Sequence, residues 1–149
     1  MTVSFDLDGT LIPFQEDDFA TEKRNFFQRL IGIEPIRMGA TFLFKELNRR
    51  GHKVGIYTTS YRNITWIRFQ LLTYGIRTDF VINEALNRAK LQTKNLSCSK
   101  YPPAFNIDLH IDDAAGVAIE GEKLNFKTIL LLKNDLDWLD KIINTCNDN

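Results

Sequence analysis

The stretch TVSFDLDGT, residues 2–10, joins a short apolar segment to two aspartates and a glycine. Thr2–Phe5 is typical of a strand that begins almost at the start of the chain. In extended backbone, a spacing of two directs the Asp6 and Asp8 carboxylates to the same side, and Gly9 then permits a sharp turn. Two adjacent carboxylates suit a bound cation or a pair of nucleophile and acid. The simpler alternative is a polar turn with solvated acids.

The rest of the chain alternates short apolar runs with longer amphipathic ones, without repeats or linkers. We expect further strands at Val54–Tyr57, Phe80–Ile82, Asp108–Ile111 and Thr128–Leu132. We expect helices at Phe26–Leu30, Met38–Arg50, around Ile64–Leu72 and around Trp138–Ile143, the last capped by Asn134 or Asp135. This alternation favours a doubly wound, Rossmann-like α/β fold, with a mostly parallel sheet and helices on both faces. The length predicts a single domain, residues 1–149.

Charge and composition argue against a general attraction to polyanions or membranes, and they leave a local basic patch open. Nineteen basic and nineteen acidic residues cancel, so no global field attracts nucleic acid or an anionic membrane. Cys98 and Cys146 have neither metal-ligand spacing nor redox-pair spacing, and we expect free thiols in a reducing compartment. The first residues do not resemble a signal peptide, and no apolar stretch approaches the roughly 20 residues that span a bilayer. We therefore expect a cytoplasmic protein without a membrane partner.

Polar clusters follow three of the expected strands, at residues 6–10, 58–60 and 112–113. In doubly wound sheets, ligands bind beyond the carboxyl ends of the strands, so we expect these clusters to meet in one site. The alternative for Asp112 and Asp113 is a helix cap. The alternative for Thr58 is an ordinary hydroxyl at the end of a strand.

The segment FDLDGTL, residues 5–11, resembles the first motif of the haloacid dehalogenase-like (HAD) phosphohydrolases. Residues 57–60, YTTS, resemble the second motif, in which a Thr or Ser contacts the phosphoryl group, and residues 111–113, IDD, resemble the acidic fourth motif. The resemblance covers the whole chain, since the motifs occur in the family's order and each follows an expected strand. It implies a Mg²⁺-dependent phosphatase that forms an aspartyl-phosphate intermediate.

The resemblance implies a role for each motif residue. Asp6 would be the nucleophile, because a carboxylate is ordinarily ionised at neutral pH and needs no base. Asp8 would protonate the leaving oxygen and then deprotonate water, and neighbouring carboxylates would help it to hold the first proton. Thr58 and Thr59 would bind the phosphoryl oxygens. The metal ligands would be Asp6, the backbone carbonyl of Asp8, and Asp112 or Asp113.

The family's third motif is a lysine, for which the chain offers Lys90, Lys94 and Lys100. We favour Lys100, as a catalytic and phosphate-binding residue, because the surrounding sequence KYPP resembles the lysine–proline context common in the family. It is closer to the acidic pair than is usual, so the intervening helix must be missing or shortened. Lys90 and Lys94 have the alternative of a solvated helix face.

Three other features lie near the motifs. Two of them have both a functional and a structural interpretation, and for the third we expect a structural role. Arg62 follows the second motif and would reach a phosphate, or it is a surface arginine at a helix start. His110 alternates with Leu109 and Ile111 along a strand, so it points to the opposite face, and we expect a hydrogen-bonded structural histidine. The segment Phe14–Phe19 is either a mobile flap over the site or a loop with hydrophobic anchors.

Both gaps beside the second motif are too short for the cap domain that closes many HAD active sites. The gap from Thr10 to Thr58 holds a flap and connecting helices, and the gap from Ser60 to Lys100 holds a helix, a strand and a short helix or loop. Such an open site suggests a phosphorylated macromolecule as substrate, or a homo-oligomer in which a second subunit closes the site.

Other functions use similar residues. A phosphotransferase, or a nucleotide or nucleic-acid end phosphatase, would share the whole set. A receiver-like signalling module also combines acids, a Thr or Ser and a Lys on a doubly wound sheet. It places its acidic pair after the first strand, however, whereas this chain has its acidic pair late. A catalytically idle binding domain on the same fold is the last alternative, although the acidic motifs here are intact.

Overall fold

The computed structural model of the chain describes residues 1–147, which contain one five-stranded sheet. The strands are β1 (Thr2–Phe5), β2 (Lys53–Tyr57), β3 (Phe80–Ile82), β4 (Leu109–Asp112) and β5 (Lys127–Leu130). They lie in the order β3-β2-β1-β4-β5, and every neighbouring pair is parallel. The predicted doubly wound, Rossmann-like α/β fold is confirmed, with strand ends shifted by one or two residues.

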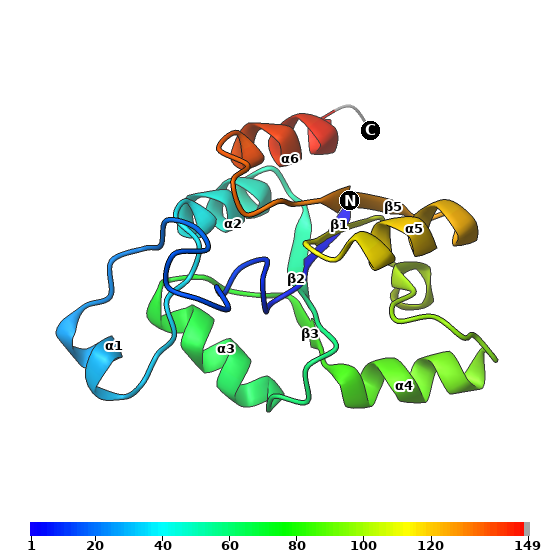
Figure 1. Cartoon of the computed structure of the whole chain (residues 1–149), viewed down its shortest axis with the longest axis horizontal. Helices are drawn as coiled ribbons and strands as arrows, with labels where there is room; N and C mark the ends of the chain where they lie inside the picture. Colours follow the sequence, from blue (N-terminus) through cyan, green and yellow to red (C-terminus); the bar gives the residue numbers. More distant parts are fainter. Residues whose placement is uncertain (148–149) are drawn as a thin grey trace.

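Helices cover both faces of this sheet (Figure 1). They are α1 (Phe26–Leu30), α2 (Ala40–Arg49), α3 (Ile64–Thr73), α4 (Glu84–Thr93), the 3₁₀ helix η1 (Pro102–Phe105), α5 (Ala115–Leu124) and α6 (Trp138–Asn147). The helices α2, α3 and α6 lie on one face, and α4 and α5 lie on the other (Figure 1). The sequence predicts α1, α2, α3 and α6. It allows only a short helix or loop at α4, because two of the three buried positions there, Glu84 and Asn87, are polar. It predicts no helix at α5.

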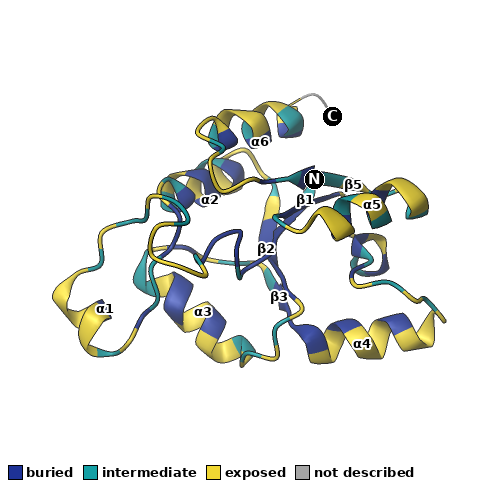
Figure 2. Cartoon of the chain, in the orientation of Figure 1, coloured by how far each residue is buried: buried dark blue, intermediate teal, exposed yellow. Residues whose placement is uncertain are grey.

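The core fills the face covered by α2, α3 and α6, where alternate strand residues are apolar and buried. The strands and the sheet-facing sides of these helices form the buried part of the chain (Figure 2). The strand residues in this core include Val3, Phe5, Val54, Ile56, Leu109 and Ile111. The opposite face carries a smaller apolar cluster of Tyr57, Ile82 and Ile107. Beside it, Ser4 and His110 are completely buried although both are polar. Buried polar groups need hydrogen-bonding partners, so this face is built differently from the apolar one.

The segments between strands hold helices and loops but no second sheet or inserted domain within residues 1–147. The chain between β1 and β2 contains α1 and α2, and the chain between β2 and β3 contains only α3. The expected absence of a cap agrees with this arrangement. None of the helices described in residues 1–147 is both long and apolar enough to cross a membrane.

Candidate active site

The carboxyl ends of β1 and β4 bring the two acidic motifs together. Ser4 pairs with His110 and Phe5 with Ile111, so the next residues along, Asp6 and Asp112, lie side by side. The backbone N–H of Asp6 continues the ladder by donating to the Ile111 carbonyl at 2.8 Å. Parallel pairing of two neighbouring strands is therefore enough to place residues 106 positions apart in one site.

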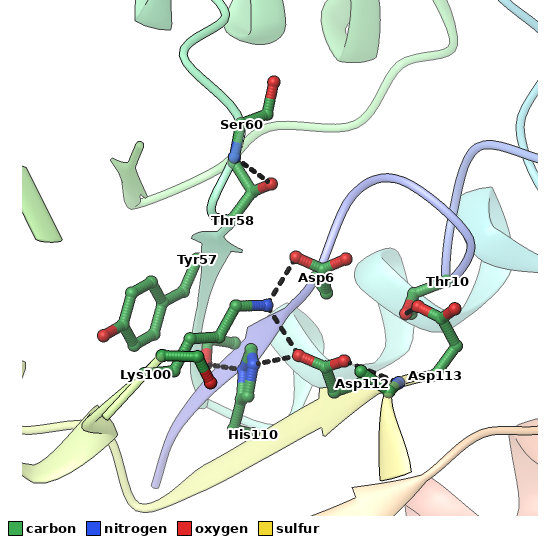
Figure 3. A network of polar contacts seen from close by, with 12 residues as sticks. Asp6, Thr10, Tyr57, Thr58, Ser60, Lys100, His110, Asp112 and Asp113 are labelled. Carbon is green, nitrogen blue, oxygen red and sulfur yellow. Dashed lines mark hydrogen bonds and ion pairs between the residues drawn. The ribbon is translucent and has the colours of Figure 1, made fainter. Parts of the chain in front are cut away.

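Lys100 lies between these two aspartates (Figure 3). Its Nζ donates to Asp6 Oδ1 at 2.5 Å and to Asp112 Oδ2 at 2.6 Å, and the whole residue is only 2% exposed. Only the single 3₁₀ turn of η1 separates Lys100 from β4, as its position in the sequence required. Lys90 and Lys94 are exposed and lie at the far end of α4. Of the three lysines, the structure brings Lys100 into contact with the acidic motifs.

Three carboxylates form a compact cluster next to this lysine. Oxygen atoms from Asp6, Asp112 and Asp113 lie within 4.8 Å of one another. Asp113 Oδ1 accepts a hydrogen bond from the Thr10 hydroxyl at 2.9 Å, which ties the acidic pair to the turn after β1. An all-oxygen donor set of this kind suits a hard cation such as Mg²⁺ or Ca²⁺ rather than zinc or copper.

The turn after β1 depends on glycine at position 9. Gly9 has a φ of +85°, a left-handed conformation that residues with a Cβ rarely adopt. A Cβ at this position would also lie 2.3 Å from Asp113 Oδ2 and would collide with the acidic cluster. Both constraints apply to the same residue, so the glycine of the first motif shapes the site as well as the turn.

Burial changes the acidity of the two aspartates that share Lys100. Burial raises the pKa of Asp6 to about 7, with Asp112 acting in the same direction and Lys100 opposing it. Burial also disfavours the charge on Asp112, but hydrogen bonding to His110 and the charge of Lys100 outweigh it and lower the pKa of Asp112. The pKa values of the two aspartates shift in opposite directions because His110 hydrogen-bonds to Asp112 and not to Asp6. The expectation that Asp6 is already ionised at neutral pH needs correction, because burial holds its pKa at about 7 even with Lys100 in contact, and the group is then only partly ionised at that pH.

His110 is part of the same network. Its Nε2 lies 2.9 Å from Asp112 Oδ2 and its Nδ1 lies 2.8 Å from the Ser4 hydroxyl (Figure 3). Burial lowers the pKa of His110 to about 4, so the ring is neutral near pH 7. Nε2 then donates to the carboxylate, and Nδ1 accepts from Ser4. The sequence predicts a hydrogen-bonded histidine but not its partner. The signal was available, because residues two apart on a strand point to the same face.

Asp8 lies apart from the carboxylate cluster and contacts a cation. Arg62 Nη2 donates to Asp8 Oδ1 at 2.7 Å and to Glu34 Oε1 at 3.1 Å, and its Nη1 contacts Glu34 Oε2. Hydrogen bonding to Glu34 is the largest effect that raises the pKa of Arg62. The expected contact of Asp8 with neighbouring carboxylates is thus replaced by a contact with a guanidinium. No sequence feature marks Glu34 as a partner, because its loop pairs with no strand.

The second motif forms the opposite wall of the site. The buried Thr58 Oγ accepts a hydrogen bond from the Ser60 N–H at 3.1 Å, and Ser60 Oγ accepts from the Arg62 N–H at 3.2 Å, so Ser60 caps a turn. A cavity of about 520 Å³ is lined by Thr58, Ser60, the exposed Thr59 and the three carboxylates of the cluster. Phe14 is exposed and also lines this cavity.

The other end of the Phe14–Phe19 segment behaves differently. Phe19 stacks under the Arg37 guanidinium, with 4.1 Å between the cation and the ring centroid. The segment therefore has one anchored aromatic ring and one ring over the site.

A second cavity, of about 700 Å³, lies between α4 and residues 96–99 and shares Thr59 and Ser99 with the first. The two cavities are therefore neighbours on the surface.

Comparisons of the chain with protein-family models, with curated proteins and with solved structures find no match. The structure itself shows a parallel sheet in an α/β fold, with a cluster of aspartates at the carboxyl ends of its strands.

Proposed function

We propose that this chain is a Mg²⁺-dependent phosphatase of the HAD type, with Asp6 as the nucleophile. The observation that carries the proposal is the position of Lys100 Nζ, which bridges Asp6 and Asp112 within a cluster of three carboxylates. A structural ion pair would need one carboxylate for one lysine. Three carboxylates and one lysine leave a buried excess of negative charge, which is costly unless a cation is bound there.

The donor set fits Mg²⁺, which prefers hard oxygen ligands and keeps several of its waters. Asp6, Asp112 and Asp113 would hold the ion, together with the backbone carbonyl of Asp8. A bound Mg²⁺ would reduce the repulsion between the anionic nucleophile and an anionic phosphate ester.

The residues of the chain would then carry out two displacements. In the first, a carboxylate oxygen of Asp6 bonds to phosphorus, the bond from phosphorus to the leaving oxygen breaks, and Asp8 gives that oxygen a proton. In the second, water attacks the aspartyl phosphate and gives a proton to Asp8, and the bond between phosphorus and Asp6 breaks to release inorganic phosphate. Lys100 neutralises charge at the nucleophile, and Thr58 and Thr59 donate hydrogen bonds to the phosphoryl oxygens.

The substrate in this proposal is a phosphate ester that reaches an open site. The second cavity adjoins the first at Thr59 and Ser99, and it offers further surface to a substrate larger than a single phosphoryl group. A phosphorylated macromolecule would cover the site with its own surface, or the second subunit of a homo-oligomer would do so, and either would exclude water.

The ion pair between Arg62 and Asp8 favours a second candidate, a phosphotransferase whose donor has a good leaving group. An Asp8 oxygen that is committed to a guanidinium is less available to carry a proton to the leaving group in the first displacement, although it remains a suitable base for the second. The two candidates differ in how strongly the rate depends on the leaving group. A series of aryl phosphates of graded leaving-group acidity separates them, because an acid-assisted phosphatase shows a weak dependence and a phosphotransferase of this kind shows a steep one.

The direct test is hydrolysis of p-nitrophenyl phosphate with and without Mg²⁺, in the wild-type protein and in Asp6→Asn. We expect activity that a chelator abolishes and Mg²⁺ restores, and no activity or acyl phosphate in the variant. Asp140→Asn makes the same change at an exposed position on α6 and serves as the control. Near-normal turnover by Asp6→Asn would exclude the covalent route.

A further inference from the structure

Asp112 differs from the other carboxylates of the cluster in how fully its oxygens are engaged. Its Oδ2 accepts from both Lys100 Nζ, at 2.6 Å, and His110 Nε2, at 2.9 Å. Its Oδ1 accepts from the Ala114 N–H at 2.8 Å. A carboxylate has about four lone-pair positions, two on each oxygen. Three are therefore occupied, and the remaining one lies on Oδ1.

The other two carboxylates have more capacity for a cation. Lys100 donates to Oδ1 of Asp6, and Thr10 donates to Oδ1 of Asp113. For these two, the described side-chain hydrogen bonds engage one oxygen and not the other, and both residues line the cavity. Asp112 is thus the member that contributes a single oxygen to a metal, because both lone pairs of its Oδ2 are in use.

The contact from His110 to Asp112 is fixed by its surroundings. His110 and its cross-strand partner Ser4 are both fully buried, and the Ser4 hydroxyl holds Nδ1 at 2.8 Å. The Tyr57 ring packs against the imidazole, with 5.3 Å between the ring centroids. A carboxylate only accepts hydrogen bonds, so Nε2 must carry the hydrogen that points at Oδ2. Burial, the Ser4 hydroxyl and the Tyr57 ring together hold the imidazole in this orientation.

Mg²⁺ and Ca²⁺ use carboxylates differently. Mg²⁺ requires a near-octahedral shell of about six oxygens, whereas Ca²⁺ takes six to eight and often binds a carboxylate through both oxygens. We propose that the Ser4–His110 pair makes this site selective for Mg²⁺ over Ca²⁺, by occupying Oδ2 of Asp112 and so keeping Asp112 a single-oxygen ligand. The inference rests on the proposed function only for the existence of the metal site, and it assigns Ser4 and His110 as positioning residues for that site.

Calorimetric titration of Mg²⁺ and of Ca²⁺ into the metal-free protein tests the inference without measuring activity. His110→Leu removes the N–H donor and frees one lone pair on Oδ2. We expect the ratio of Mg²⁺ affinity to Ca²⁺ affinity to fall by about tenfold, which is within the range for losing a group that supports a metal ligand. His110→Gln keeps an N–H donor of similar reach and should restore most of the ratio.

Ser4→Ala removes only a hydroxyl and leaves the imidazole in place, so it tests the proposal even if the Leu variant does not fold. We expect a smaller fall in the same ratio, because Nδ1 loses the donor that fixes the ring. Thermal unfolding of each variant checks that it is folded. Tight binding of both ions with an unchanged ratio in the folded variants would overturn this inference and leave the metal site intact. Failure of the wild-type protein to bind either ion would instead overturn the metal site of the proposed function.

Discussion

The two faces of the sheet are made by alternate residues of the same strands, yet their chemistry is opposite. In β1, Val3 and Phe5 point into the apolar core, whereas Ser4 points to the other face and Asp6 follows it. The same alternation in β4 separates Leu109 and Ile111 from His110 and Asp112. One face is therefore a continuous apolar layer. The other carries two rows of buried polar residues, Ser4 with Asp6 along β1 and His110 with Asp112 along β4.

The two faces are expected to contribute differently to stability and to function. Apolar burial contributes about 25 cal/mol for each Å² removed from water and needs no exact partner. The polar rows contribute little net stability, because each buried group must first recover the hydrogen bonds it loses from water. Their partners are specific, as in the contacts of Ser4 with His110 and of Lys100 with two aspartates. We therefore expect changes on the apolar face to alter stability and changes on the polar face to alter function.

The largest effect is expected for Lys100→Met on the polar face. Removing the ammonium leaves Asp6 and Asp112 without their shared cation and removes the charge that would balance the nucleophile. We expect phosphatase activity at saturating Mg²⁺ to fall by about 10³-fold or more, equivalent to about 4 kcal/mol of transition-state stabilisation. Lys90→Met, at an exposed position on α4, is the control. Activity within tenfold of wild type would show that Lys100 is only a structural partner.

The next effect is expected for Leu109→Ala on the apolar face. Leu109 is 1% exposed and belongs to the main core, so truncation leaves a cavity. We expect the free energy of unfolding to fall by about 2–5 kcal/mol, measured by urea denaturation. The kcat of the folded fraction should stay within about twofold of wild type. A loss of kcat in parallel with stability would mean that the two faces are not separable.

Much of this arrangement follows from local sequence, because the strand ends and the polar clusters are contiguous. The spacing of Asp6 from an apolar strand, and of Asp112 from another, was sufficient to predict a shared edge. The choice of Lys100 rested on its neighbours in the sequence, and the structure shows why the short connection allows it. Only η1 lies between Lys100 and β4, so the lysine has little chain with which to move away.

The rest could not be predicted, because it depends on contacts between distant segments. Glu34 and Arg62 come from loops that pair with no strand, and their ion pair with Asp8 has no periodic signal. The boundaries of α4 were obscured by its buried polar residues, Glu84 and Asn87, whose role appears only with their partners. Asn87, for example, accepts a hydrogen bond from the buried Tyr57 hydroxyl at 2.6 Å.

A smaller effect on function is expected from the two partners around Asp8. Arg62→Gln removes the guanidinium that occupies Asp8 Oδ1 and leaves that oxygen available for proton transfer, so hydrolysis of esters with poor leaving groups should rise by about three- to tenfold. Glu34→Gln removes the competing carboxylate and leaves Arg62 to Asp8 alone, so the same rate should fall. Aryl phosphates with good leaving groups, measured in parallel, should respond little to either change. Equal effects on both classes of ester would mean that Asp8 does not donate the proton.

The smallest effect concerns the pH dependence of metal binding on the polar face. Burial raises the pKa of Asp6 to about 7, so in metal-free protein this carboxyl gains a proton as the pH falls through 7. A metal ligand must be deprotonated, and the proton therefore competes with Mg²⁺. Between pH 8 and pH 6 the ionised fraction of such a group falls by about tenfold, and we expect the Mg²⁺ affinity to weaken by about the same factor.

Calorimetry in two buffers of different ionisation enthalpy should also detect the release of close to one proton at pH 6. Any Mg²⁺ binding that remains in Asp6→Asn should lose the part of this dependence that comes from Asp6; of the two remaining ligands, Asp112 has a lowered pKa and stays ionised, whereas burial raises the pKa of Asp113. An affinity that is flat from pH 6 to pH 8 would mean that Asp6 is ionised without metal. Lys100 alone would then balance the charge on both aspartates, and the polar face would be set up for catalysis before any cation arrives.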